Sequence, residues 1–145
     1  MSSRQLPPSK SKDDPFLGSW SLVPELAQYE FGQPPQGGTY RIEASGEGYL
    51  IAMEWLAAEG TAHQLSYPAI PDGKEYPYEN PAVADTVSMT RIDRQTLDST
   101  SKKSGRIIGY AHRVLSDDGL AMTVYQSGTA PDGQDFTNVA TYKKQ

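Results

Sequence analysis

The chain has 145 residues, no cysteine and a formal net charge of −5. This length suits one domain, because two domains would each be too small to build a sizeable core. The absence of cysteine excludes disulfides, thiolate metal sites and cysteine nucleophiles. The acidic balance argues against nucleic acid or an anionic membrane as the main partner, and no apolar run approaches the ~20 residues of a membrane-spanning helix.

Residues 1–15 read MSSRQLPPSKSKDDP, in which only Met1 and Leu6 are apolar. We expect this segment to be a disordered or artificially added tail, followed by a single domain over residues 16–145. The tail lacks the apolar core of a secretory signal. We therefore expect a cytoplasmic protein, or a periplasmic one if an upstream signal was removed.

From Phe16 onward, turn signals such as Asp72-Gly73 and Asp118-Gly119 separate runs rich in Val, Ile, Thr and Tyr. This pattern is typical of an all-β sandwich or barrel whose neighbouring strands pair antiparallel. Residues 24–28 permit one helical turn, and Pro34-Pro35 prevents a longer helix. The predicted strands cover residues 18–23, 38–45, 49–58, 61–70, 84–92, 95–102, 106–116, 120–128 and 136–144, with a short additional one near 74–79.

The two faces of these strands are less distinct than a packed sandwich requires. Between residues 110 and 115, for example, one face carries Tyr110, His112 and Val114, and the other carries Ala111, Arg113 and Leu115. Mixed faces suit a barrel whose interior holds polar groups, water or a ligand. We therefore predict an all-β fold, a single antiparallel up-and-down β-barrel of eight to ten strands with little or no helix. Because the chain has nine tyrosines and three phenylalanines, we also expect several hydroxyls to converge on the barrel interior or mouth.

The run Phe16-Leu17-Gly18-Ser19-Trp20 resembles the first strand of the calycins, the superfamily of lipocalins and fatty-acid-binding proteins. The chain end, VATYKK at 139–144, resembles the last strand of fatty-acid-binding proteins. Further motifs resemble a group of uncharacterised bacterial lipocalin-like proteins: DGKEYP at 72–77, ADTV at 84–87, RVLSDDG at 113–119 and FTNVATYKKQ at 136–145. The resemblance covers residues 16–145 and implies a calycin-type barrel, but no known activity.

Two features depart from the fatty-acid-binding-protein pattern. That family holds a ligand carboxylate with an Arg-x-Tyr pair on the last strand, whereas this chain has Ala140-Thr141-Tyr142. The short link between the first two predicted strands also leaves no room for the family's helix-turn-helix lid. The resemblance therefore implies the barrel without that carboxylate site.

Several residues are candidates for roles in the barrel. Trp20 is expected to seal one end, with Arg91 or Arg113 covering its ring. Trp55 offers a flat wall to a ligand, although it also fits plain core packing. Tyr76 and Tyr78 flank a proline, and this stiff loop either rims the mouth or packs on neighbouring strands. Arg91 shares a face with apolar residues, so we favour it as the interior cation. The residues expected to line the ligand site are Trp55, Tyr76, Tyr78, Arg91, His112 and Tyr125.

These candidates favour a protein that binds a small apolar or amphipathic molecule inside the barrel, with no nucleic acid, no membrane insertion, and a homodimer allowed. His63 and His112 lack a close HxH or HExxH partner, so no metal, cofactor or catalytic residue is assigned. One alternative is a barrel enzyme in which His112 and Tyr110 or Tyr125 form an acid–base pair. Another is a packed barrel that serves as a structural or interaction module. A cavity of a few hundred Å³ would separate the binding protein from the packed module.

Overall fold

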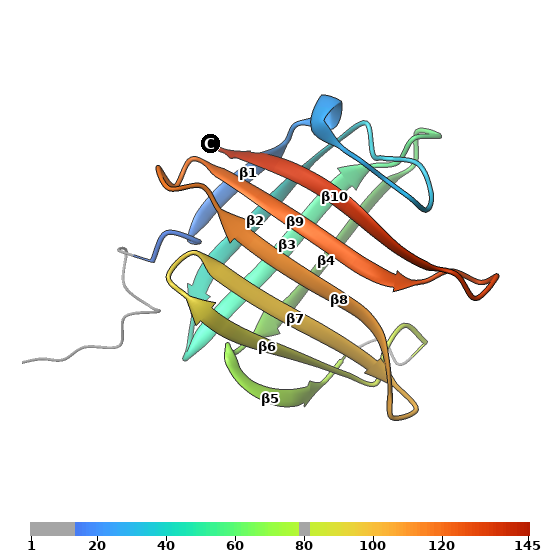
Figure 1. Ribbon diagram of the computed structural model, residues 1–145. Coiled ribbons are helices and arrows are strands. Elements are labelled where there is room, and N and C mark those ends of the chain that lie inside the picture. Colours follow the sequence, from blue (N-terminus) through green and yellow to red (C-terminus); the bar gives the residue numbers. More distant parts are fainter. Residues whose placement is uncertain (1–13, 79–81) are drawn as a thin grey trace, which may run out of the picture.

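The computed structural model describes residues 14–78 and 82–145, and these form one curled antiparallel sheet of ten strands (Figure 1). The sheet order is β4-β3-β2-β1-β10-β9-β8-β7-β6-β5, so the first and last strands of the chain pair in the middle of the sheet. In chain order the strands are β1 (Gly18–Leu22), β2 (Gly37–Ser45), β3 (Gly48–Leu56), β4 (Ala62–Ala69), β5 (Asp72–Pro77), β6 (Thr86–Asp93), β7 (Thr96–Lys103), β8 (Arg106–Leu115), β9 (Ala121–Thr129) and β10 (Asp135–Lys144).

The predicted all-β fold is confirmed, and every predicted strand lies within two residues of an observed one at each end. The helical turn is a single 3-10 turn, η2 (Pro24–Leu26). Tight turns fix the strand ends. Between β7 and β8, for example, Ser104 and Gly105 both have positive φ, 53° and 76°, as a two-residue hairpin turn that follows the sheet twist requires. None of the helices in residues 14–78 and 82–145 is long and apolar enough to cross a membrane.

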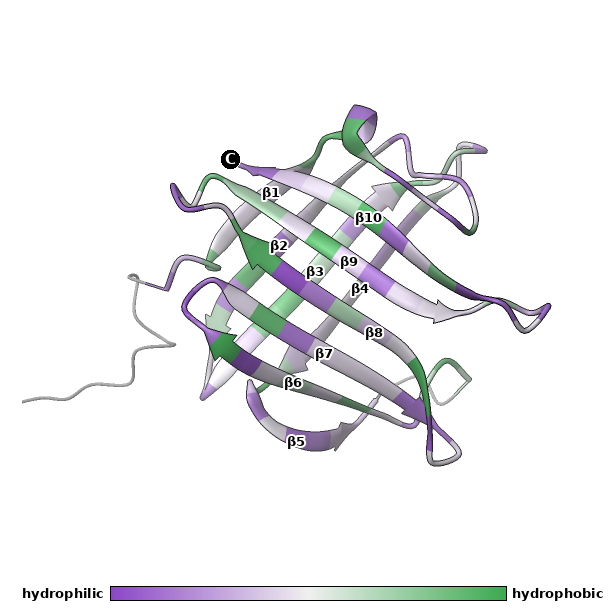
Figure 2. Ribbon diagram, in the orientation of Figure 1, coloured by the Kyte–Doolittle hydropathy of each residue, from purple (hydrophilic) through white to green (hydrophobic). Residues whose placement is uncertain are grey.

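Apolar and polar residues alternate along the strands, as Figure 2 shows by the changes of colour along β6 to β9. The inward residues pack into one core that includes Trp20, which is fully buried. The indole Nε1 of Trp20 donates to the carbonyl oxygen of Phe16 at 3.1 Å, and the ammonium of Lys144 lies 4.8 Å from the ring centre. The predicted burial of Trp20 is confirmed, but the prediction of Arg91 or Arg113 as the cation over its ring is wrong. Lys144 takes that place, whereas Arg91 lies over Phe16 and Arg113 over Tyr40.

The edge strands β4 and β5 are adjacent in the chain and yet lie at opposite edges of the sheet. Only Ile70 and Pro71 connect them. Side chains meet between these edges: the ring of Tyr67 on β4 lies 6.0 Å from the ring of Tyr78, which directly follows β5, and the two rings are nearly perpendicular. We call this side-chain contact between β4 and β5 the seam. A cavity of about 210 Å³ lies at the seam, beside Tyr67, Tyr76 and Tyr78.

Asp14 packs with the folded domain, although the sequence prediction assigned it to the tail. Its side chain is buried, and it accepts a hydrogen bond from the backbone N–H of Phe16 at 3.0 Å. The domain therefore includes residues before the predicted boundary at residue 16. The rest of the predicted tail, residues 1–13, lies outside the described residues.

Candidate ligand-binding cavity

A cavity of about 240 Å³ lies inside the curled sheet, where the inward faces of β2, β3 and β4 oppose those of β6 to β10. We call it the interior cavity. Its walls combine apolar side chains such as Met53, Leu65 and Val124 with hydroxyl and amide groups. Six tyrosines line it, although one of them, Tyr110, directs its hydroxyl to Asp98. The other five tyrosines and the one charged residue of the lining are Tyr29, Tyr40, Tyr67, Tyr78, Tyr142 and Arg113.

Arg113 is the central polar group of this cavity. It lies on β8 and alternates with outward-facing His112 and Val114, so its side chain points inward and is only 3% exposed. Its Nε donates to the hydroxyl of Tyr40 at 2.6 Å, and one terminal nitrogen donates to the Ser99 hydroxyl at 2.7 Å. The other terminal nitrogen lies 3.5 Å from the Tyr67 hydroxyl. Three strands other than β8 thus hold this one guanidinium.

No carboxylate of the described chain pairs with Arg113, and it is the sole charged side chain among the described residues that line the interior cavity. Burial opposes its charge, but the oxygens of Tyr40 and Tyr67 favour it more strongly and leave the pKa of Arg113 above its usual value. The guanidinium therefore stays positively charged at every physiological pH. The cavity holds one permanent cation that is solvated by neutral hydroxyls.

Tyrosine rings surround this cation. The rings of Tyr40 and Tyr142 meet edge to face at 5.4 Å, and those of Tyr67 and Tyr78 do so across the seam. Burial raises the pKa of Tyr67 to about 12 and raises that of Tyr142 as well, so both phenols remain protonated and can donate hydrogen bonds. The prediction that tyrosines converge on the interior or mouth is confirmed, since more than half of the nine line this cavity.

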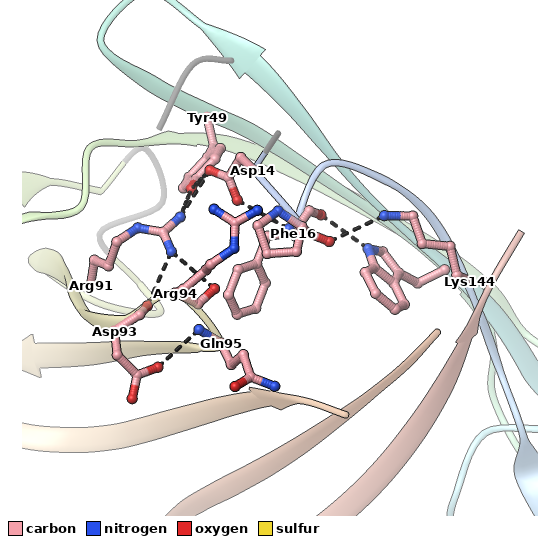
Figure 3. A network of polar contacts seen from close by, with 10 residues as sticks. Asp14, Phe16, Tyr49, Arg91, Asp93, Arg94, Gln95 and Lys144 are labelled. Atoms are coloured by element: carbon pink, nitrogen blue, oxygen red, sulfur yellow. Dashed lines mark hydrogen bonds and ion pairs between the residues drawn. The ribbon is translucent and has the colours of Figure 1, made fainter. Parts of the chain in front are cut away.

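The favoured interior cation, Arg91, faces inward as predicted, but it lies outside the interior cavity and is already paired (Figure 3). Its guanidinium donates to Asp14 Oδ2 at 2.8 Å and also to the Tyr49 hydroxyl, which itself donates to the same carboxylate. Burial and the hydrogen bond to Asp14 raise the pKa of Tyr49. Arg91 thus belongs to a structural network with Asp14 and Tyr49, and Arg113 is the cation that lines the cavity.

The other predicted site residues lie in the interior cavity, at the seam, in an open groove, and on the outer face of the sheet. Tyr78 lines the interior cavity, whereas Tyr76 lies at the seam and donates its hydroxyl to Asp72 Oδ2 at 2.5 Å. Trp55 does not line the cavity. Its ring stacks on His63 with centres 5.2 Å apart, and both residues line an open groove together with the adjacent glycines 37 and 38.

His112 and Tyr125 lie side by side on the outer face of the sheet, and their ring centres are 5.8 Å apart. His112 Nδ1 is 2.6 Å from Asp98 Oδ1, and the other oxygen of that carboxylate accepts the hydroxyl of Tyr110 at 2.5 Å. Neither His112 nor Tyr125 lines the interior cavity. The alternative of an interior acid–base pair of His112 with Tyr110 or Tyr125 is therefore not supported, because His112 lies on the outer face and does not line the cavity.

The residues that the sequence reasoning missed are Arg113 as the cavity cation and Tyr40 and Tyr142 as its aromatic surroundings. A signal for Arg113 was present, because it shares its strand face with the small Ala111 and with Gly109, which has no side chain, and both leave open space beside it. No group of three or more His, Asp or Glu side chains that could hold a metal ion occurs in the described part of the chain.

No family model matches this chain. Solved structures of similar fold include the two that follow. The zebrafish ileal bile acid-binding protein in complex with cholic acid has a TM-score of 0.53 and 12% identity, covering 90% of this chain and 99% of that one. As-p18, an extracellular fatty acid binding protein, has a TM-score of 0.52 and 19% identity, covering 91% and 97%. The chain therefore has a calycin-type fold, the β-barrel architecture of lipocalins and fatty-acid-binding proteins.

Proposed function

We propose that this protein binds an amphipathic small molecule in the interior cavity and that Arg113 holds the anionic group of that ligand. The observation that carries the proposal is the burial of the Arg113 guanidinium with hydroxyl partners and no carboxylate. A buried charge without a counter-charge costs several kcal/mol. A bound anion would offset this cost, and apolar walls such as Met53 and Val124 would take the remainder of the ligand.

Arg91 provides an internal comparison. It lies on the same concave side of the sheet, and the chain supplies it with the carboxylate of Asp14. At Arg113 only neutral oxygens are supplied, although the side chain is more deeply buried. The difference supports a role for Arg113 toward a group that is not part of the protein.

The two similar structures support the same class of ligand. One is described as bound to cholic acid and the other as a fatty acid binding protein, so both descriptions name an acid. At identities of 12% and 19% they carry the fold alone, and the argument for an acidic ligand rests on Arg113. The existence of a cavity also favours binding over the alternative of a fully packed barrel.

The test is binding of salicylate, a fluorescent carboxylate with a single aromatic ring, together with native mass spectrometry of protein purified from its own host. We expect probe binding that Arg113→Gln weakens at least tenfold, because a lost charge-assisted hydrogen bond to an ion is worth about 1.5–3 kcal/mol. The matched control is Arg106→Gln, the same change on the same strand at an exposed position. If no small molecule co-purifies and the probe binds Arg113→Gln as well as the unmodified protein, the proposal is wrong.

A further inference from the structure

We propose that the ligand of the interior cavity is a compact aromatic carboxylic acid and that long-chain acids are excluded. This inference rests on the proposed function and narrows it to one chemical class. It is carried by three properties of the cavity: its size, the rings in its walls, and the hydrogen-bond donors that Arg113 has left.

The size of the cavity sets the upper limit. Its volume of about 240 Å³ is below the ~300–1,000 Å³ of pockets that take drug-sized ligands. It is larger than the ~150 Å³ cavity that accommodates benzene in another protein. One aromatic ring with an acidic substituent falls between these limits, whereas a long alkyl chain would have to leave through the mouth or through the seam.

The walls favour a ring over a short alkyl chain. Tyr40 and Tyr142 present an edge and a face at 5.4 Å, and Tyr67 and Tyr78 present another such pair at 6.0 Å. Aromatic pairs in offset or edge-to-face geometry gain affinity beyond the area that they bury. The guanidinium of Arg113 lies 5.8 Å from the centre of the Tyr40 ring. A guanidinium stacks well on aromatic rings, so the cation and the rings can bind one aromatic ligand together.

The remaining donors favour a carboxylate. A guanidinium has five N–H groups, and Arg113 makes hydrogen bonds to Tyr40, Ser99 and Tyr67 among the described residues. Two N–H groups are left for a ligand, and the bond to Tyr67 is long enough at 3.5 Å to be exchanged for a better acceptor. Two donors on one planar group match the two oxygens of a carboxylate.

The experiment is titration calorimetry of the whole protein with four ligands: trans-cinnamate, its neutral amide cinnamamide, octanoate and palmitate. We expect cinnamate to bind at least tenfold more tightly than cinnamamide, several-fold more tightly than octanoate, and palmitate to show no saturable binding. In Arg113→Gln, cinnamate should lose at least tenfold in affinity and cinnamamide less than twofold. Arg106→Gln should leave all four values unchanged.

Two further measurements separate a loss of binding from a loss of folding. Arg113→Lys retains the charge, so it should keep cinnamate ahead of cinnamamide even if Arg113→Gln folds poorly. Thermal unfolding of each variant shows whether the fold is intact. If octanoate or palmitate binds more tightly than cinnamate and still depends on Arg113, the proposed function stands and this inference is overturned. If no acid binds, or if binding ignores Arg113 in a folded variant, both are overturned.

Discussion

Arg91 and Arg113 show that the strand face on which a residue lies does not determine its depth in the barrel. Both alternate correctly with outward residues, and both carry a full positive charge on the concave side of the sheet. Arg91 pairs with Asp14 beside Phe16, whereas Arg113 lines the interior cavity. The phase of a strand predicts the face on which a residue lies. Depth along the barrel axis depends on how the strands stagger, which no single strand encodes.

Tyr67 carries a prediction about alkaline stability. Burial raises the pKa of Tyr67 from 10.0 to about 12, so the unfolded chain loses this proton first as the pH rises. Between pH 10 and about 12 the folded state binds more protons than the unfolded state, and stability falls as the pH increases. The loss due to Tyr67 should be on the order of 1–3 kcal/mol across this window.

Urea denaturation over that pH range measures this loss. Tyr67→Phe should make the alkaline decline shallower, because the variant has no ionisable phenol at this position. Tyr125→Phe, the same change at an exposed position on the outer face, should leave the decline as steep as in the unmodified protein. Equal slopes for the two variants would contradict the assignment to Tyr67.

At the scale of elements, strand boundaries were predictable from the sequence, while the inward face of β8 was not. Turn pairs such as Asp118-Gly119 interrupt the β-forming runs, and each interruption fixes a strand end by local backbone chemistry. On β8, however, the apolar Val114 lies on the outward face, and the charged Arg113 lies inward beside the small Ala111. Hydrophobicity alone does not decide the orientation, because apolar residues lie on both faces: Leu115 is buried on the face of Arg113, and the ring of Tyr110 faces out toward Asp98.

The segment that precedes β1 carries a second prediction. Asp14 accepts hydrogen bonds from Arg91, from the Tyr49 hydroxyl and from the backbone of Phe16, and its side chain is 1% exposed. Asp14→Asn removes the counter-charge of Arg91 and should lower the free energy of unfolding by about 1–3 kcal/mol, less than for a fully buried pair because Arg91 retains some solvent contact. Chemical denaturation measures the change.

The control for this variant is Asp132→Asn, an identical exchange in an exposed turn where Asp132 accepts the backbone N–H of Gln134. It should change stability by no more than about 0.5 kcal/mol. Equal stability of Asp14→Asn and the unmodified protein would show that the segment before β1 only rests against the barrel and does not hold its end together.

At the scale of the whole molecule, the calycin-type fold followed from the sequence more readily than the site. Gly18 and Trp20 mark the first strand, the turns divide the chain into strands, and mixed faces indicate a polar interior. The site required knowledge of which distant residues meet. Tyr40 and Arg113, 73 positions apart, form one hydrogen bond inside the cavity. Neither residue is unusual in its own strand, and only the closure of the sheet brings them together.

The seam has a consequence for the connectivity of the fold. Except for the pairing of β1 with β10, every strand pairing joins strands that are consecutive in the chain. The sheet is open between β4 and β5, and only two residues connect these strands. A circular permutant that begins at Pro71, ends at Ile70 and joins residue 145 to residue 14 by a short linker would turn the β10–β1 pairing into one more local hairpin. We expect this permutant to keep the ten-stranded sheet and to fold faster than the natural order, because its mean contact order is lower. Stopped-flow refolding of the two chains compares the rates, and a slower permutant would show that the end-to-end pairing of β1 with β10 does not limit folding.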